Sequence, residues 1–169
     1  SNLLMASPIC FAAKPSASSP RVATWGAGML ATVPGEAPDF SGQTLRQLVH
    51  TSVGGKQVRV WLSNRFGREP LHIGAAHVAL GTNASPSADE SAIQSGSDRT
   101  LTFNQQGSVM IPPGAAIVSD PVTLEVPALS NLAVSVYFPD HTMATTEHSS
   151  AQQISYSATG NVVDSSDLA

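Results

Sequence analysis

The sequence has almost no cysteine and little charge. One cysteine among 169 residues cannot form an internal disulfide, and the same count excludes zinc ribbons and CxxC redox pairs. Only 12% of the residues are charged, the basic residues number eight, and the net charge is −4. Nucleic-acid binding needs a basic footprint, and attachment to an anionic membrane surface needs a polybasic patch. Neither occurs here, so we expect no nucleic-acid partner.

Long apolar runs and long helical stretches are also missing. No run approaches the roughly 20 apolar residues that a membrane span needs, so no span is predicted. The 12 prolines and 13 glycines are spread along the chain, which disfavours long helices. The length and the 41% hydrophobic content are sufficient for one domain with a buried core.

The chain divides into three regions. Residues 1–20 are mildly apolar and then rich in Ser and Pro, so they are interpreted either as the remnant of a secretory leader or as an ordinary disordered terminus. Residues 21–160 carry the regular pattern of a domain, and residues 161–169 are expected to form a tail or linker. A secretory leader implies a secreted or periplasmic protein.

What the sequence does contain is an apolar–polar pattern that repeats every two residues. Apolar and polar residues alternate in short stretches between turn-forming residues, which is typical of half-buried strands. We predict an all-β, antiparallel, jelly-roll-like β-sandwich of about eight strands. Beside a hairpin at 44–64, the expected strands include residues 71–80, 99–103, 108–111, 116–118, 122–126, 132–138 and 153–158, with 21–25 as a candidate first strand.

Residues 44–64 are interpreted as a β-hairpin with Gly54-Gly55 as its turn, because paired glycines accept the positive φ of two-residue turns. In this register one mainly apolar face points to a core. The other face places Leu48 opposite Trp61 and His50 opposite Arg59. An apolar island with a polar rim is the usual appearance of an interaction surface. We therefore predict a docking or ligand-binding surface formed by Trp61, Leu48, Arg46, His50 and Arg59.

No arrangement for nucleophilic catalysis is recognisable. There is no GxSxG turn, Ser108 lacks the flanking pattern of a nucleophile, and Cys10 lies in the N-terminal stretch. His72 and His77 share one expected strand but point to opposite faces, so a shared metal would need a bulge between them. We therefore predict no catalytic residue, no metal site and no cofactor in this chain.

The densest group of ionisable residues follows the expected 132–138 strand. Asp140-His141 and Glu147-His148 flank one loop. Carboxylate and carbonyl oxygens in a compact loop are the ligands that hard cations prefer. A solvated loop and a cation or ligand site both agree with this pattern, and the sequence leaves the two open.

Aromatic rings that could cover a sugar are few. The candidates are Trp25, Trp61, Tyr137 and Tyr156. Packing of Trp61 against another strand or another domain is the alternative to a sugar platform, and four scattered rings weigh against a dedicated carbohydrate-binding module.

A set of segments occurs in one order along the chain. They are Val22-Ala23-Thr24-Trp25, residues 43–55, residues 58–67, residues 73–79, Ser119-Asp120-Pro121-Val122 and residues 129–137. Together they resemble the N-terminal region of secreted bacterial SGNH (GDSL-type) hydrolases, and the resemblance covers about residues 21–160.

The resemblance implies a parent esterase or lipase whose catalytic domain would follow this one, with a Gly-Asp-Ser nucleophile motif and a late Asp-x-x-His. This chain has no Gly-Asp-Ser, and Asp140 is followed directly by His141, so no catalytic residue carries over. The implied role is a non-catalytic domain that docks on the C-terminal SGNH catalytic domain of the same polypeptide or helps present its substrate, with acylated carbohydrate among the candidates. The alternative is a free-standing carbohydrate-binding module.

Overall fold

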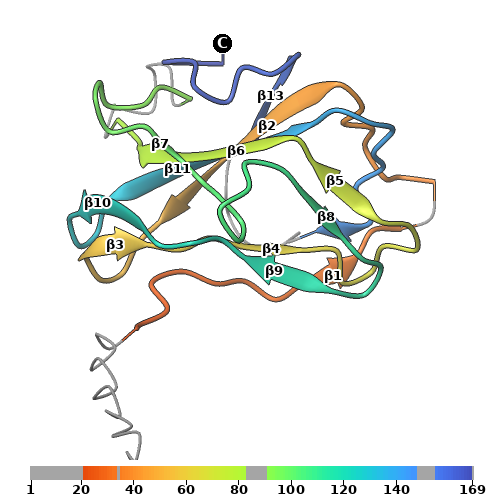
Figure 1. Ribbon diagram of the computed structural model, residues 1–169, viewed down its shortest axis with the longest axis horizontal. Coiled ribbons are helices and arrows are strands. Elements are labelled where there is room, and N and C mark those ends of the chain that lie inside the picture. The colour runs from red at the N-terminus through yellow and green to blue at the C-terminus, as the bar shows by residue number, and fades with distance from the viewer. Residues whose placement is uncertain (1–20, 34, 83–90, 148–154, 169) are drawn as a thin grey trace, which may run out of the picture.

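The computed structural model describes residues 21–33, 35–82, 91–147 and 155–168. Within these ranges the chain forms strands, turns and loops, and no helix. Figure 1 shows two layers of strands, and the buried apolar side chains lie between them. The predicted all-β antiparallel sandwich is therefore confirmed.

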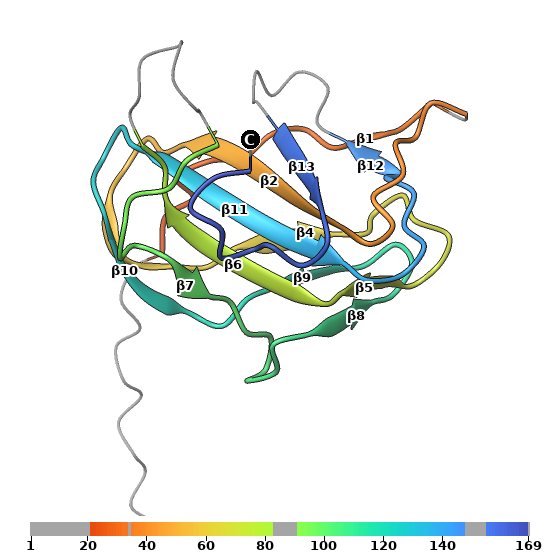
Figure 2. The same cartoon turned by 90° about the horizontal axis from the view of Figure 1, so that it is seen from above.

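The first layer is a five-stranded antiparallel sheet with the order β13-β2-β11-β6-β7. Figure 2 looks onto the face of this sheet. Strands far apart in the sequence are neighbours in it. The strands are β2 (Gln43–His50), β6 (Ala75–Leu80), β7 (Arg99–Thr100), β11 (Asn131–Phe138) and β13 (Ser155–Thr159).

Strand β11 lies in the middle of this sheet. Leu132, Val134 and Val136 alternate along it and belong to the core cluster. The residues between them face the opposite side of the sheet, where Ser135 lies across from Arg46 of β2 and from His77 of β6. Both faces are covered, so nearly the whole strand is buried.

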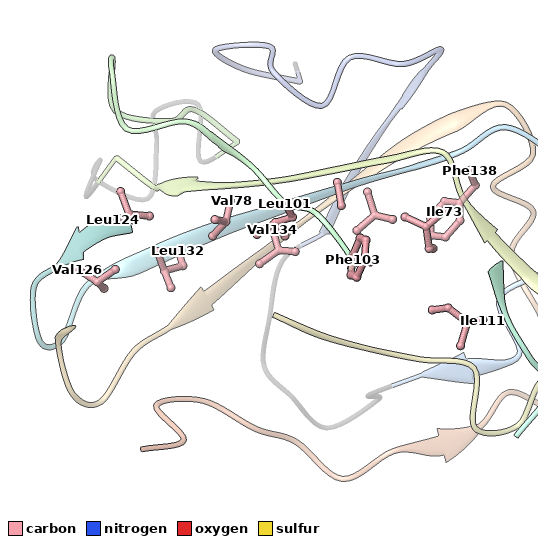
Figure 3. Packing of buried hydrophobic residues seen from close by; sticks show 12 residues of the cluster. Ile73, Val78, Leu101, Phe103, Ile111, Leu124, Val126, Leu132, Val134 and Phe138 are labelled. Carbon is pink, nitrogen blue, oxygen red and sulfur yellow. The ribbon is translucent and has the colours of Figure 1, made fainter. Parts of the chain in front are cut away.

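The second layer consists of short antiparallel pairs. Strand β3 (Gly55–Val58) pairs with β10 (Val122–Val126), β4 (Trp61–Ser63) with β9 (Ala116–Val118), and β5 (Leu71–Ile73) with β8 (Val109–Ile111). Leu124, Val126 and Ile111 from these strands pack in the same core as Leu132 and Phe138 of the first layer (Figure 3).

The expected strand at 71–80 is broken at Gly74, where β5 ends and β6 begins. The Gly74 N–H donates to the Tyr137 carbonyl oxygen at 2.9 Å. A Cβ at Gly74 would lie 3.0 Å from the Tyr137 ring and the Pro139 side chain, so a glycine permits this close approach. The break lets one stretch of chain pair with β8 and then with β11.

The N-terminal region differs from the expected first strand. Residues 21–25 have no strand pairing, and the first strand is β1 (Leu30–Ala31), which pairs with β12 (Thr146–Glu147). Thr24 is instead hydrogen-bonded to the connection that follows β2. The Thr24 hydroxyl donates to the Val53 carbonyl oxygen at 2.7 Å, and the Ser52 N–H donates to the Thr24 carbonyl oxygen at 3.0 Å.

The expected hairpin at 44–64 is wrong. Strand β2 pairs with β11 and β13, whereas β3 pairs with β10 in the other layer. Residues 51–54 carry the chain between the layers, and the Thr51 N–H donates to the Ser130 carbonyl oxygen at 2.8 Å. The period-two pattern cannot distinguish these outcomes, because a strand with one apolar face satisfies it with any partner.

Gly54 has a different role from the expected turn. Its φ is not positive, but a Cβ there would lie 2.5 Å from the Val126 carbonyl oxygen and 2.8 Å from the Ala128 nitrogen. The glycine therefore lets two backbones approach closely where the chain changes layers.

Residues 161–168, where a tail or linker was expected, pack on the outer face of the five-stranded sheet. Val163 is buried, and the Leu168 N–H donates to the Ser91 hydroxyl at 2.8 Å. Arg46 lies beneath this segment with no exposed surface. Its guanidinium donates to the carbonyl oxygens of Ser91 and Ser165, at 2.8 and 2.7 Å.

Candidate functional site

Among the residues that the structure describes, the most exposed large hydrophobic side chain is that of Trp61, with 72% of its surface accessible. The alternation along β4 explains this position, because Leu62 packs against the core and its neighbours must point away from it. The strand pairing places Val118 of β9 directly opposite Trp61, on the same outer face.

The polar side of this surface is held in place by hydrogen bonds. Arg59 lies two residues before Trp61 and donates from Nε to the Ser119 carbonyl oxygen at 2.6 Å. Ser119 is fully buried, and its hydroxyl accepts from the Val60 N–H at 3.0 Å. These bonds fix the Arg59 stem beside the strand. We call Trp61, Val118 and Arg59 the Trp61 patch.

Asp120 follows Ser119 in the chain and is held by hydrogen bonds of its own. Its carboxylate accepts from the Gln105 N–H and from the Thr102 hydroxyl, both at 2.7 Å. These two hydrogen bonds lower the pKa of Asp120 below its ordinary value of 3.8, and the nearby Arg59 cation acts in the same direction. Both hydrogen bonds tie Asp120 to the 102–105 segment.

Of the predicted docking surface, the structure brings together only Trp61 and Arg59. Arg46 and Leu48 lie on the five-stranded sheet, Arg46 fully buried and Leu48 half-buried. His50 is exposed at the end of β2, where its Nδ1 lies 2.8 Å from the Asn131 Oδ1. These three were assigned to the surface of Trp61 through the wrong hairpin register.

Sequence reasoning missed Val118 as a neighbour of Trp61. Residues 116–118 were expected as a strand, but pairing between β4 and β9 brings together segments that are distant in the sequence. A period-two pattern gives the face of a residue and not its cross-strand partner, so no signal in the sequence named Val118.

The predicted loop group is only partly assembled. Asp140 and His72 share a hydrogen bond, Oδ2 to Nδ1 at 2.7 Å, and His141 Nδ1 lies 3.1 Å from the Ser41 hydroxyl. Glu147 lies in β12, paired with Leu30. His148 lies outside the described residues. Among the residues that the structure describes, no three His, Cys, Asp or Glu side chains form a group that could hold a metal ion.

Asp39 joins this loop group, although no pattern in the sequence pointed to it. The Ser41 hydroxyl and the Ser41 N–H both donate to its carboxylate. The hydroxyl lowers the pKa of Asp39 most, the N–H next, and His141 adds a smaller effect of the same sign. The Ser41 hydroxyl also accepts from the Thr142 N–H at 2.9 Å, so these bonds tie two turns together.

A hydroxyl, an imidazole and a carboxylate also lie in a row at the edge of the five-stranded sheet. His77 Nδ1 is 2.7 Å from Asp98 Oδ2, and His77 Nε2 is 3.3 Å from the Thr100 hydroxyl. Nucleophilic catalysis would also need donors aimed at a developing oxyanion. The neighbouring donors are already engaged, because the Leu101 N–H bonds to the Ala76 carbonyl oxygen and Arg99 to three carbonyl oxygens. We assign this row to the attachment of β7 to β6.

Comparison of the chain with models of known protein families finds no match, and comparison with curated proteins also finds none. Among the residues that the structure describes, no helix has the length and apolarity needed to cross a bilayer. Membership of the SGNH hydrolases therefore stays a prediction from the sequence, whereas the antiparallel β-sandwich and the geometry of the Trp61 patch are properties of the structure.

Proposed function

We propose that this chain is a non-catalytic domain of a secreted or periplasmic SGNH-type esterase or lipase, and that it docks on the SGNH catalytic domain through the Trp61 patch. The observation that carries the proposal is the exposure of Trp61 on a sheet face. Its support is fixed by the bonds of Arg59 and Ser119. The identity of the partner comes from the resemblance of residues 21–160.

An exposed tryptophan suits a protein interface better than solvent. A buried aromatic side chain removes roughly 150–250 Å² of surface from water, and tryptophan and arginine are enriched among the residues that dominate binding. The Arg59 Nε already has its acceptor, so burial of the patch leaves this group satisfied. Docking would therefore gain apolar burial and leave the Arg59 Nε–H paired.

Carbohydrate binding is the alternative that the same test separates. A polysaccharide platform needs several exposed rings in a row. Trp61 is exposed, whereas Trp25, Tyr137 and Tyr156 are each half-buried, so the part of the chain that the structure describes presents no such row.

The test needs the catalytic partner and three forms of this domain. The gene region that follows the codon for Ala169 is sequenced, and an SGNH domain encoded there is expressed and titrated calorimetrically with the wild-type domain, Trp61→Ala and Met110→Ala. Met110 is a matched control, because it is also exposed, at 52%, but lies on β8. We expect Trp61→Ala to weaken binding at least about ten-fold and Met110→Ala to leave it within about two-fold.

Three results would contradict the proposal: no SGNH domain in the gene, equal loss of binding in both variants, or binding to polysaccharides that depends on Trp61. An ester-hydrolysis assay of this domain alone is expected to give no activity. Hydrolysis that disappears in Thr100→Val would assign catalysis to the row of Thr100, His77 and Asp98 instead.

A further inference from the structure

Strand β13 forms one edge of the five-stranded sheet, and the hydrogen-bond ladder shows which of its backbone groups point outward. The Thr51 N–H donates to the Ser130 carbonyl oxygen, and this pair continues the register of β2 with β11. Bonded pairs alternate in an antiparallel ladder, so Thr44 and Arg46 direct their backbone groups toward β13.

The partners of Thr44 and Arg46 on β13 are Ala158 and Tyr156. The backbone N–H and C=O groups of Ser155, Ser157 and Thr159 must therefore point away from the sheet. All three residues are exposed, and none of these outward groups bonds to a described residue.

This edge lacks the features that usually protect a sheet edge. Edge strands are normally very short, bulged, or protected by lysine, proline or inward charge. Strand β7, at the other edge, is short, with 2 residues. Strand β13 has 5 residues, Ser-Tyr-Ser-Ala-Thr, with no charge and no proline, and its register with β2 has no bulge.

We propose that β13 pairs antiparallel with β13 of a second copy of this chain, about a two-fold axis at Ser157. In this register Ser157 lies opposite Ser157 of the second copy, and Ser155 lies opposite Thr159. Each of these pairs exchanges two backbone hydrogen bonds. The two five-stranded sheets then form one continuous sheet.

The strand itself favours a second copy over another peptide. When the strand meets itself about Ser157, each outward-bonding residue lies opposite an outward-bonding residue of the second copy. Tyr156 lies opposite Ala158 of the second copy, twice, so a ring meets a small side chain and not another ring. No like charges oppose each other within the strand, which is the usual obstacle to self-pairing.

The test measures oligomeric state against concentration by sedimentation equilibrium, from about 10 μM to about 1 mM, which covers the affinity of small interfaces. The wild-type chain is expected to pass from monomer to dimer in this range. Ser157→Lys places two ammonium groups opposite each other at the axis and should raise the dimer Kd at least about ten-fold.

Two further variants distinguish loss of pairing at the β13 edge from unfolding of the domain. Ser157→Pro removes an outward N–H and none of the hydrogen bonds to β2, so it should abolish the dimer without breaking the ladder to β2. Ser157→Thr keeps a neutral hydroxyl and should dimerise like the wild type, and circular dichroism checks that all variants fold. A wild-type monomer at every concentration overturns the proposal, as does a dimer that Ser157→Lys and Ser157→Pro leave unchanged.

Discussion

Arg46 shows how one polar residue can fix the layout of a sandwich. Its guanidinium is fully buried, its Nε donates to the Ser135 hydroxyl at 2.8 Å, and its terminal nitrogens reach carbonyl oxygens of two other segments. A planar fork of donors suits this task, whereas an ammonium group has a different geometry. Arg46 therefore joins β2, β11, the loop at Ser91 and the C-terminal segment.

Replacement of Arg46 by lysine is expected to lower the free energy of unfolding by about 2–4 kcal/mol, because buried carbonyl oxygens lose their donors. Urea denaturation of Arg46→Lys against the wild type measures this change. Arg65→Lys is the control, since Arg65 is exposed, and it should change the free energy by less than about 0.5 kcal/mol. Equal effects of the two substitutions would contradict the role of Arg46.

The lowered pKa of Asp120 predicts how the stability of the fold changes in acid. Its folded-state pKa lies below 3.8, because Gln105 and Thr102 donate to the ionised form. The stabilisation is therefore complete above the unfolded-state pKa and is lost as the pH falls through the lower folded-state pKa. In urea midpoints measured from about pH 6 down to about pH 2, Asp120→Asn should remove part of the acid-induced decrease.

Glu125→Gln is the control for this pH series. It removes the same formal charge from an exposed position of β10. A wild-type acid profile in Glu125→Gln and a flatter one in Asp120→Asn would support the assignment, and the reverse order would refute it.

At the scale of elements, the crossing between layers at residues 51–54 leaves no room for a side chain at Gly54. A Cβ at Gly54 would meet backbone atoms at 2.5 and 2.8 Å, whereas a Cβ at Gly55 would meet only the Gln57 carbonyl oxygen, at 3.7 Å. We expect Gly54→Ala to destabilise the fold by about 1–3 kcal/mol, because rigid backbone must move.

Gly55→Ala is the matched control, next in sequence, and thermal or urea unfolding compares the two. A small or neutral effect of Gly55→Ala beside a large effect of Gly54→Ala is the expected result. A larger effect of Gly55→Ala would indicate that the turn, and not the close approach, requires glycine at this connection.

The sequence predicted the elements better than their partners. The stretches at 116–118 and 122–126 coincide with β9 and β10, because alternation there is regular. The pairing of Leu48 with Trp61 failed, because the energetic reason for it, burial of one apolar face, is satisfied equally by β11. The close approach at Gly54 and the bond from Thr51 to Ser130 accompany the observed pairing, and both depend on distant residues.

The candidate site was predictable to the same extent. Trp61 was expected on a face away from the core and lies on one, with Arg59 nearby. Val118 and Asp120 join it through strand pairs and loop contacts that alternation alone cannot specify. Arg46 was expected on the surface, where arginine usually lies, but its carbonyl acceptors belong to segments that the sequence does not place.

At the scale of the molecule, the two proposed contacts belong to different layers. The Trp61 patch lies on β4 and β9, and the unpaired edge lies on β13 of the five-stranded sheet. Distant sites without shared partners behave additively. Trp61→Ala is therefore expected to leave the dimer Kd unchanged, and Ser157→Lys to leave docking unchanged, in the two binding experiments.

A double variant completes this comparison. Trp61→Ala with Ser157→Lys should lose as much docking free energy as Trp61→Ala alone and as much dimerisation free energy as Ser157→Lys alone, each within about 0.5 kcal/mol. Loss of both docking and dimerisation in either single variant would mean that the sites are one interface, and the two proposals would then fail together.

The order of strands in the five-stranded sheet also governs when this chain can fold. Strand β2 lies between β11 and β13, both from the last part of the sequence. As the ribosome adds about 5–20 residues per second, β2 emerges long before either neighbour and waits for them as an unpaired, partly apolar segment. The nascent chain must therefore be kept from aggregating until Thr159, the last residue of β13, has left the exit tunnel.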